Sequence, residues 1–164
     1  MTEIQDLAVR VGDRLVEREM TISVGEIDTG GLIGSRLMAV PGATRFFKGG
    51  IICYGGTLMR EVVKISPDLL QEKGAVSPEV ATALAHQVRE LSDADITIAQ
   101  SGITGPTGSR SGRPIGMVYI ALVGRDNTEI VIQENWDSPD RYGNMLKTTE
   151  RALRLVWEHL TGHI

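Results

Sequence analysis

The segment MTISVGEIDTGGLIGSRLMAV, residues 20–40, predicts a strand, a tight turn and a helix in direct succession. Met20 to Ile27 is short, apolar and β-branched, which is typical of a buried strand. Asp28 to Gly31 supplies the turn, and the apolar run from Leu32 to Val40 favours a helix. This strand–turn–helix unit indicates an α/β fold.

The rest of the chain continues the alternation of helices and strands. We expect helices at 3–19, 57–65, from Ser77 and from Pro139, and strands at 50–54, 94–100, 115–124 and 129–136. The last two strands should form a hairpin around the polar turn 125–127. The order predicts a single domain, 1–164, folded as a three-layer α/β/α sandwich with a mixed sheet.

The predicted helix that begins at Ser77 has the clearest start signal. Ser77 can cap it, Pro78 suits its first turn, and Glu79 complements the helix dipole. Four residues should then form its apolar face: Val80, Leu84, Val88 and Leu91. In the last predicted helix the corresponding face should hold Leu146, Leu153, Val156 and Leu160.

Composition and charge exclude several classes of protein. The formal net charge is −4 and no basic stripe is present, so we expect no nucleic-acid partner. No apolar run approaches the roughly 20 residues of a membrane span, and the acidic N-terminus does not resemble a signal peptide. A lone cysteine, Cys53, fits a cytoplasmic protein. The scattered histidines predict no metal site, and we expect no cofactor.

Three predicted loops follow the first three strands: 25–31, 54–56 and 101–116. If these strands are parallel neighbours, the loops converge on one cleft at their carboxyl ends. The third loop, SGITGPTGSRSGRPIG, is rich in glycine, whose backbone N–H groups can approach an anion closely. Arg110 and Arg113 add charge that can bind a phosphate. Such loops are also common as simple connections.

Five segments resemble, in order and spacing, the CinA C-terminal domain family: GEIDTGG, GIICY, KGAVSPEVA, SGITGPTG and RPIGMVYIAL. The family includes the bacterial nicotinamide mononucleotide amidohydrolases. The resemblance covers nearly the whole chain and implies an α/β/α sandwich that self-associates into homo-oligomers. The implied reaction hydrolyses the carboxamide of nicotinamide mononucleotide to nicotinic acid mononucleotide and ammonia. The implied form is that of the stand-alone deamidases, which lack the family's large N-terminal domain.

The resemblance is close in the frame of the site and poor at its reactive positions. The family's first loop usually reads A-E-S-C-T-G-G, and here Glu26, Thr29, Gly30 and Gly31 match it. The serine acts as the nucleophile in the family and a lysine is its base partner. The positions of the serine, cysteine, asparagine, lysine and a later arginine hold Ile27, Asp28, Gly56, Met59 and Met145. An amide hydrolase needs an activated nucleophile, which isoleucine cannot supply.

One interpretation is a protein that retains a pocket for a nucleotide or other small anionic molecule, with deamidation altered or lost. The residues expected to bind the ligand are Thr29, Gly30, Gly31, Gly102, Gly105, Gly108, Arg110 and Arg113. Arg60 is a further candidate for anion binding. Glycines and arginines of this kind remain useful to a pocket without catalysis.

Two other interpretations stay open. The first is an active amidohydrolase in which Asp28 or Glu26 acts as base or nucleophile and Tyr54 as acid. Against it, Glu26 can simply order its loop and Asp28 can cap the following helix. Tyr54 can equally be an ordinary residue at a strand end. The second is a purely structural or oligomeric protein without a ligand.

Overall fold

A mixed sheet forms the centre of the molecule. The computed structural model describes residues 3–108 and 112–164, and over these residues five strands pair in the order β2-β1-β3-β4-β5. The strands are β1 (Ile22–Glu26), β2 (Phe47–Ile52), β3 (Ile96–Gly102), β4 (Met117–Gly124) and β5 (Glu129–Asn135). β1 pairs in parallel with both β2 and β3, whereas β3-β4 and β4-β5 are antiparallel. The parallel neighbours on which a common cleft depends are therefore present.

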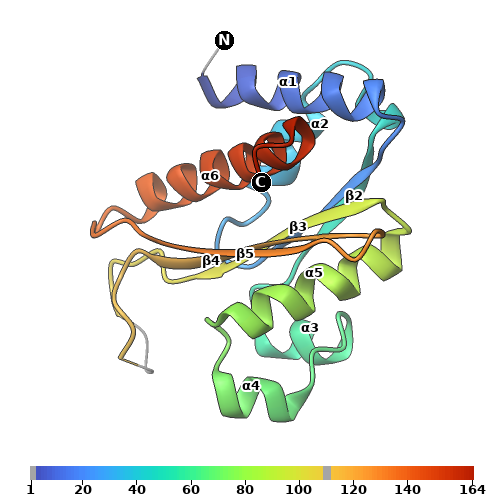
Figure 1. Ribbon diagram of the computed structural model, residues 1–164. Helices are drawn as coiled ribbons and strands as arrows, with labels where there is room; N and C mark the ends of the chain where they lie inside the picture. The colour runs from blue at the N-terminus through green and yellow to red at the C-terminus, as the bar shows by residue number, and fades with distance from the viewer. Residues whose placement is uncertain (1–2, 109–111) are drawn as a thin grey trace.

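Helices cover both faces of this sheet (Figure 1). On one face lie α1 (Glu3–Glu17), α2 (Leu32–Met38) and α6 (Arg141–Thr161). On the other lie α3 (Gly56–Glu61), α4 (Pro67–Lys73) and α5 (Pro78–Ser92). A short 3-10 helix, Ala43–Arg45, precedes β2. The predicted three-layer α/β/α sandwich is confirmed.

The core consists of two apolar clusters, one in each interface between helices and sheet. β1 is buried along its whole length, because it is central in the sheet and covered on both faces. The first cluster packs Ile22 and Ile98 of the sheet with Leu153 of α6. The second packs Ala99 of β3 with Leu84 of α5. Burial of the central strand positions the loop that follows it.

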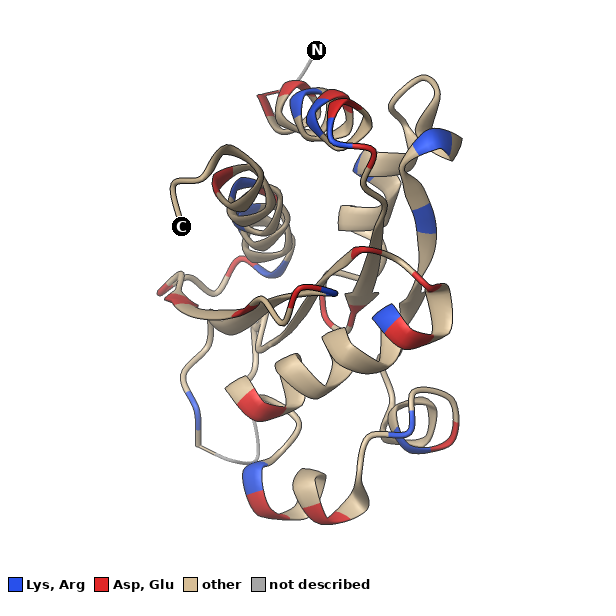
Figure 2. Ribbon diagram, turned by 45° about the vertical axis from the view of Figure 1, so that its right-hand side comes forward, with Lys and Arg blue, Asp and Glu red and all other residues tan. Residues whose placement is uncertain are grey.

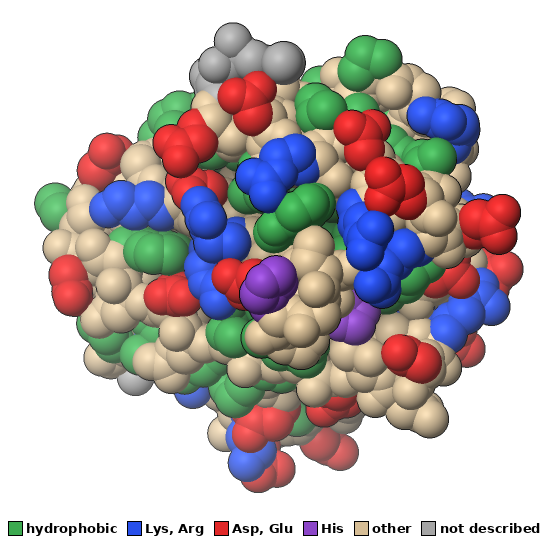
Figure 3. Space-filling model, turned by 45° about the horizontal axis from the view of Figure 1, so that its top comes forward, with side chains coloured by type: hydrophobic (Ala, Val, Ile, Leu, Met, Phe, Trp, Pro, Cys, Tyr) green, Lys and Arg blue, Asp and Glu red, His purple; other side chains and the backbone are tan. Residues whose placement is uncertain are grey.

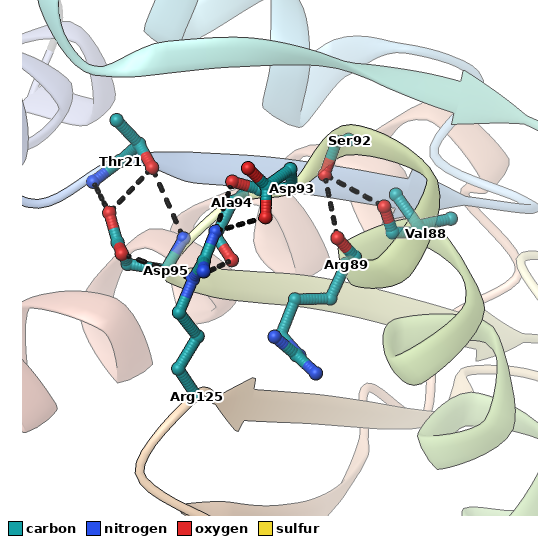
Figure 4. Close-up of polar contacts among 8 residues, drawn as sticks. All are labelled: Thr21, Val88, Arg89, Ser92, Asp93, Ala94, Asp95 and Arg125. Atoms are coloured by element: carbon teal, nitrogen blue, oxygen red, sulfur yellow. Dashed lines mark hydrogen bonds and ion pairs between the residues drawn. The ribbon is translucent and has the colours of Figure 1, made fainter.

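A polar cluster joins the amino ends of β1 and β3 (Figure 4). Asp95 Oδ2 accepts hydrogen bonds from the backbone N and the hydroxyl of Thr21, at 2.7 and 2.6 Å. Arg125, in the β4–β5 turn, forms ion pairs with Asp93 and Asp95 and donates to the carbonyl of Ala94. These contacts fix the end of the sheet opposite to the loops of the expected cleft.

Some predicted elements differ from the structure. Helix α4 was not predicted, although Ser66-Pro67-Asp68 repeats the start signal of α5, and Ser66 does cap α4. Leu91 was expected on the buried face of α5 but is 61% exposed, because the buried stripe ends at Val88. Pro139 does not open α6; the N-cap is Asp140, whose side chain accepts from Gly143 N.

Charged residues of both signs are distributed along the helices (Figure 2), and their side chains are mixed over the face shown in Figure 3. Several form surface ion pairs, such as Arg14–Glu17 and Arg154–Glu150. Within residues 3–108 and 112–164, none of the helices is long and apolar enough to cross a membrane.

The close approach of β2 to β1 yields a stability test. A Cβ on Gly50 would lie 2.7 Å from the carbonyl oxygen of its pairing partner Val24 and would also clash with the Val24 side chain. We expect Gly50→Ala to lower the free energy of unfolding by about 1–3 kcal/mol in urea denaturation. Gly55→Ala is the matched control, since its Cβ would meet nothing within 4 Å and its φ is −125°. Equal stability of the two variants would contradict the prediction.

Candidate functional site

The loop after β1 is organised by the buried carboxylate of Glu26. Its Oε2 accepts from the Thr29 hydroxyl at 2.6 Å and from the backbone N of Gly31 and Ile33 at 2.9 and 3.2 Å. Its Oε1 accepts from Gly34 N at 2.8 Å. The side chain has no solvent exposure, so these four bonds replace its hydration. Glu26 therefore fixes the turn and the first residues of α2.

Glu26 also accepts hydrogen bonds from the start of α2, which is the capping role that the sequence suggested for Asp28. The first N–H groups of a helix need acceptors, which a capping side chain often supplies. The N-cap residue of α2 is Gly31, with φ 98°, and it has no side chain that could accept these hydrogen bonds. Three of these N–H groups point instead to Glu26. The interpretation of Asp28 as a helix cap is therefore wrong.

Thr29 links the first loop to the neighbouring strand. Its hydroxyl donates to Glu26 and accepts from the side-chain amide of Gln100, at the end of β3, at 2.6 Å. Glu26, Thr29 and Gln100 are all fully buried. None of the three lines the cavities at this edge. This arrangement favours the loop-ordering interpretation of Glu26 over a catalytic one.

Two adjoining cavities lie at the carboxyl ends of the parallel strands, and we call them together the cleft. The smaller, about 230 Å³, is lined by Asp28, Tyr54, Gly102, Thr104, Gly105 and Arg141, among others. The larger, about 370 Å³, shares four residues with it, Ile27, Tyr54, Val76 and Gly102, and adds Met59 and Arg60. All three predicted loops contribute, so the expectation that they converge is confirmed.

Asp28 is the buried acid in the wall of the smaller cavity. It is 5% exposed, and neither carboxyl oxygen has a well-formed hydrogen bond to any described residue. Desolvation raises the pKa of Asp28 from 3.8 to about 6. The backbone N–H groups of Asp28 and Gly102 and the charge of Arg141 oppose this rise without cancelling it. Strongly shifted acids in clefts are candidates for functional residues.

Arg141, at the start of α6, completes the mouth of the smaller cavity. It donates to the carbonyl of Gly105 at 2.6 Å and more weakly to the hydroxyl of Tyr54 at 3.4 Å. Tyr54 is 64% exposed. Neither Arg141 nor Thr104 was predicted from sequence as a site residue. The Thr104 hydroxyl is buried in the same cavity without a partner among the described residues. The signal available in the sequence was the charged pair Asp140-Arg141 at the predicted start of the last helix.

The expected ligand-binding residues are only partly brought together. Gly102 and Gly105 line the smaller cavity, and Arg60 lines the larger one. Arg113 instead donates to the carbonyl of Lys73 at 2.9 Å and lines neither. Three expected glycines also line neither cavity: Gly30, Gly31 and Gly108. Arg110 lies outside the described residues.

The wall of the larger cavity is apolar at the two positions that the sequence resemblance assigned to the serine and the lysine. Ile27, 7% exposed, and Met59, 4% exposed, belong to one buried cluster with Cys53. Desolvation raises the pKa of the Cys53 thiol to about 11, so it stays neutral and unreactive at neutral pH. Among the residues that the structure describes, no group of three His, Cys, Asp or Glu side chains could hold a metal ion.

Comparison with known proteins identifies the family to which this fold belongs. The family model of the CinA C-terminal domain matches residues 4–160. The chain belongs to this family. A competence/damage-inducible protein of Agrobacterium tumefaciens has the same fold at a TM-score of 0.93 with 27% identity, covering 98% of this chain and 97% of that one. A CinA superfamily protein of Klebsiella pneumoniae matches at a TM-score of 0.94 with 25% identity, over 98% and 99% of the two chains.

Two curated relatives confirm the relationship. A putative competence-damage inducible protein of Halothermothrix orenii is 36% identical over 92% of this chain and 36% of its own length. A protein with the same description from Moorella thermoacetica is 34% identical over 97% of this chain and 38% of its own length. The chain thus spans about a third of the length of these relatives.

The role of Glu26 can be tested by stability. Glu26→Ala removes the acceptor of three backbone N–H groups, that of Ile33, which is buried, and those of Gly31 and Gly34, which are partly buried, each at a cost of about 1–3 kcal/mol. We expect a loss of at least about 3 kcal/mol in the free energy of unfolding, measured with urea. Glu134→Ala, which removes a partly exposed partner of Arg151, should cost about 1 kcal/mol or less. Similar losses in the two variants would contradict the role assigned to Glu26.

The shifted pKa of Asp28 predicts a pH dependence of stability. As the pH rises from about 4 to about 6, the unfolded chain releases the Asp28 proton while the folded chain retains it, so ionisation favours unfolding. Asp28 therefore lowers the stability of the ligand-free protein by about 3 kcal/mol above pH 6, but not below pH 4. Asp28→Asn should be more stable than the original protein at neutral pH and gain little in acid. If the free energies of unfolding of the original protein and of Asp28→Asn, measured with urea, change with pH in the same way across this range, the prediction is wrong.

Proposed function

We propose that this CinA-family domain binds a small molecule in the cleft and does not deamidate nicotinamide mononucleotide. One observation carries the proposal. The positions where the family has its serine nucleophile and its lysine hold Ile27 and Met59, which belong to the same buried apolar cluster. Neither side chain can attack an amide or accept a proton. Two hydrophobic side chains that pack in one cluster thus stand where the family has its nucleophile and its base.

The polar side of the cleft supports ligand binding. Asp28 and Thr104 line the smaller cavity with buried oxygens that form no well-formed hydrogen bond to the described residues. Such groups cost free energy unless a ligand or water satisfies them. Gly102 and Gly105 keep the wall open, since a Cβ on Gly102 would lie 2.9 Å from Asp28 Oδ2 and one on Gly105 2.7 Å from Ile115. A purely structural role leaves this arrangement unexplained.

A second candidate function is hydrolysis with Asp28 as the general base. The observation in its favour is a pKa of about 6, close to the value that suits proton transfer near neutral pH. Tyr54 shares the cavity, and its hydroxyl accepts a bond from Arg141. In this candidate Asp28 activates a water molecule for attack on the substrate, and the family's covalent route through serine is not used.

Ammonia release and binding separate these functions. We expect purified protein to release ammonia from nicotinamide mononucleotide at least about a thousandfold more slowly than a family deamidase that retains the serine. In the same preparation, at least one member of a panel of nucleotides and small carboxylates should raise the melting temperature, because a ligand of the folded state stabilises it. The assays are colorimetric ammonia detection and differential scanning fluorimetry.

The contrary outcomes are distinct. Rapid ammonia release that is lost in Asp28→Asn and retained in Asp13→Asn, an exposed aspartate of α1, would support the carboxylate mechanism. Rapid release that survives Asp28→Asn would contradict both candidates. No thermal shift with any ligand of the panel would contradict the proposed binding role and leave a structural one.

A further inference from the structure

We propose that the smaller cavity binds a dipolar small molecule, with an ammonium group against Asp28 and an anionic carboxylate or phosphate against Arg141. This inference rests on the proposed binding role of the cleft and specifies the chemistry of its ligand. It follows from the charges on two walls of one cavity and from the buried polar atoms that have no partner.

The wall around Asp28 has unsatisfied acceptors. Both carboxyl oxygens of Asp28 are buried with no well-formed hydrogen bond to the described residues. The backbone N–H groups of Asp28 and Gly102 and the Gln100 side chain lie close enough to lower the pKa of this carboxyl, but the effect of burial is larger. An anionic or carbonyl group placed here would meet other oxygens. A group that donates hydrogen bonds and carries positive charge satisfies them.

Thr104 adds an adaptable partner to the same wall. Its hydroxyl is buried, lines the cavity and has no partner in the described part of the chain. A hydroxyl can accept from an ammonium group while donating to another atom of the ligand. Asn144 positions this residue, because its side-chain amide donates to the Thr104 carbonyl at 3.0 Å. The wall therefore offers several oxygens to one small nitrogen group.

The opposite charge is supplied by Arg141. Its hydrogen bonds go to neutral oxygens, the Gly105 carbonyl and the Tyr54 hydroxyl, and it forms no ion pair with a carboxylate of the described residues. Arg141 and Asp28 line the same cavity without forming an ion pair, although the charge of Arg141 lowers the pKa of Asp28. Guanidinium groups bind carboxylates and phosphates with directed N–H donors. A molecule with charge at both ends fits between them.

The volume limits the size of this ligand. A cavity of about 230 Å³ corresponds to roughly seven or eight water molecules at about 30 Å³ each. That space suits an amino acid or an aminoalkyl phosphate. Larger substituents can extend into the adjoining cavity, past Tyr54 and Val76 toward Arg60.

Calorimetric titration with a matched set of probes tests the inference. The dipolar probes are 2-aminoethyl phosphate and β-alanine, and the single-charge probes are ethyl phosphate and ethylamine. We expect one of the dipolar probes to bind at least about tenfold more tightly than either single-charge probe at neutral pH. The tighter dipolar probe then identifies the anion as phosphate or carboxylate.

Three variants test which residue binds each end of the ligand. Asp28→Asn should weaken the dipolar probe at least about tenfold without weakening ethyl phosphate. Arg141→Gln should weaken the dipolar probe and ethyl phosphate but not ethylamine. Asp13→Asn, an exposed aspartate on α1, should leave every affinity unchanged. Circular dichroism and urea unfolding establish that each variant is folded.

Two results would overturn the inference: equal binding of the dipolar probe by the original protein and Asp28→Asn, or no binding of either dipolar probe at millimolar concentration. If a nucleotide or carboxylate of the earlier panel nevertheless stabilises the protein, the proposed binding role stands and only the dipolar specificity is wrong. If that panel also fails, both are wrong.

Discussion

The four hydrogen bonds accepted by the buried carboxylate of Glu26 are the constraint on which the site depends. They hold the turn after β1 against the start of α2, and through Thr29 they connect it to Gln100 of β3. With both of its oxygens engaged, Glu26 fixes the backbone on either side of Ile27 and Asp28. Those two side chains are thereby presented to the cleft, one as part of an apolar wall and the other as a buried acid.

Most of the fold was predictable because its signals are local. The β-branched run before the first turn and the Ser77-Pro78 start of α5 each specify their element within a few residues, and the structure confirms both. The convergence of three loops also followed from sequence, since it needs only parallel neighbouring strands. Helix α4 was missed even though Ser66 gave the same kind of signal.

The site was less predictable because its contacts join distant parts of the chain. Arg141 enters the cavity through bonds to Gly105 and Tyr54, which lie 36 and 87 residues away in sequence. Arg113 and Arg141 have the same chemistry, and no local pattern shows that one bonds to the carbonyl of Lys73 while the other faces the cavity. The burial of Asp28, and hence its raised pKa, depends likewise on the packing of neighbouring strands and loops.

Because Ile27 and Met59 lie in one apolar cluster, introducing a catalytic group at either position alone has a cost in stability. A single exchange of Ile27 for serine would remove buried hydrocarbon and gain a hydroxyl without a base. A single exchange of Met59 for lysine would place a charge among apolar side chains with no partner to activate. Each exchange by itself therefore lowers stability and supplies only one member of a nucleophile–base pair. Both residues must change before a nucleophile and a base stand together in the larger cavity, whereas the wall of the smaller cavity already holds Asp28, Thr104 and Arg141.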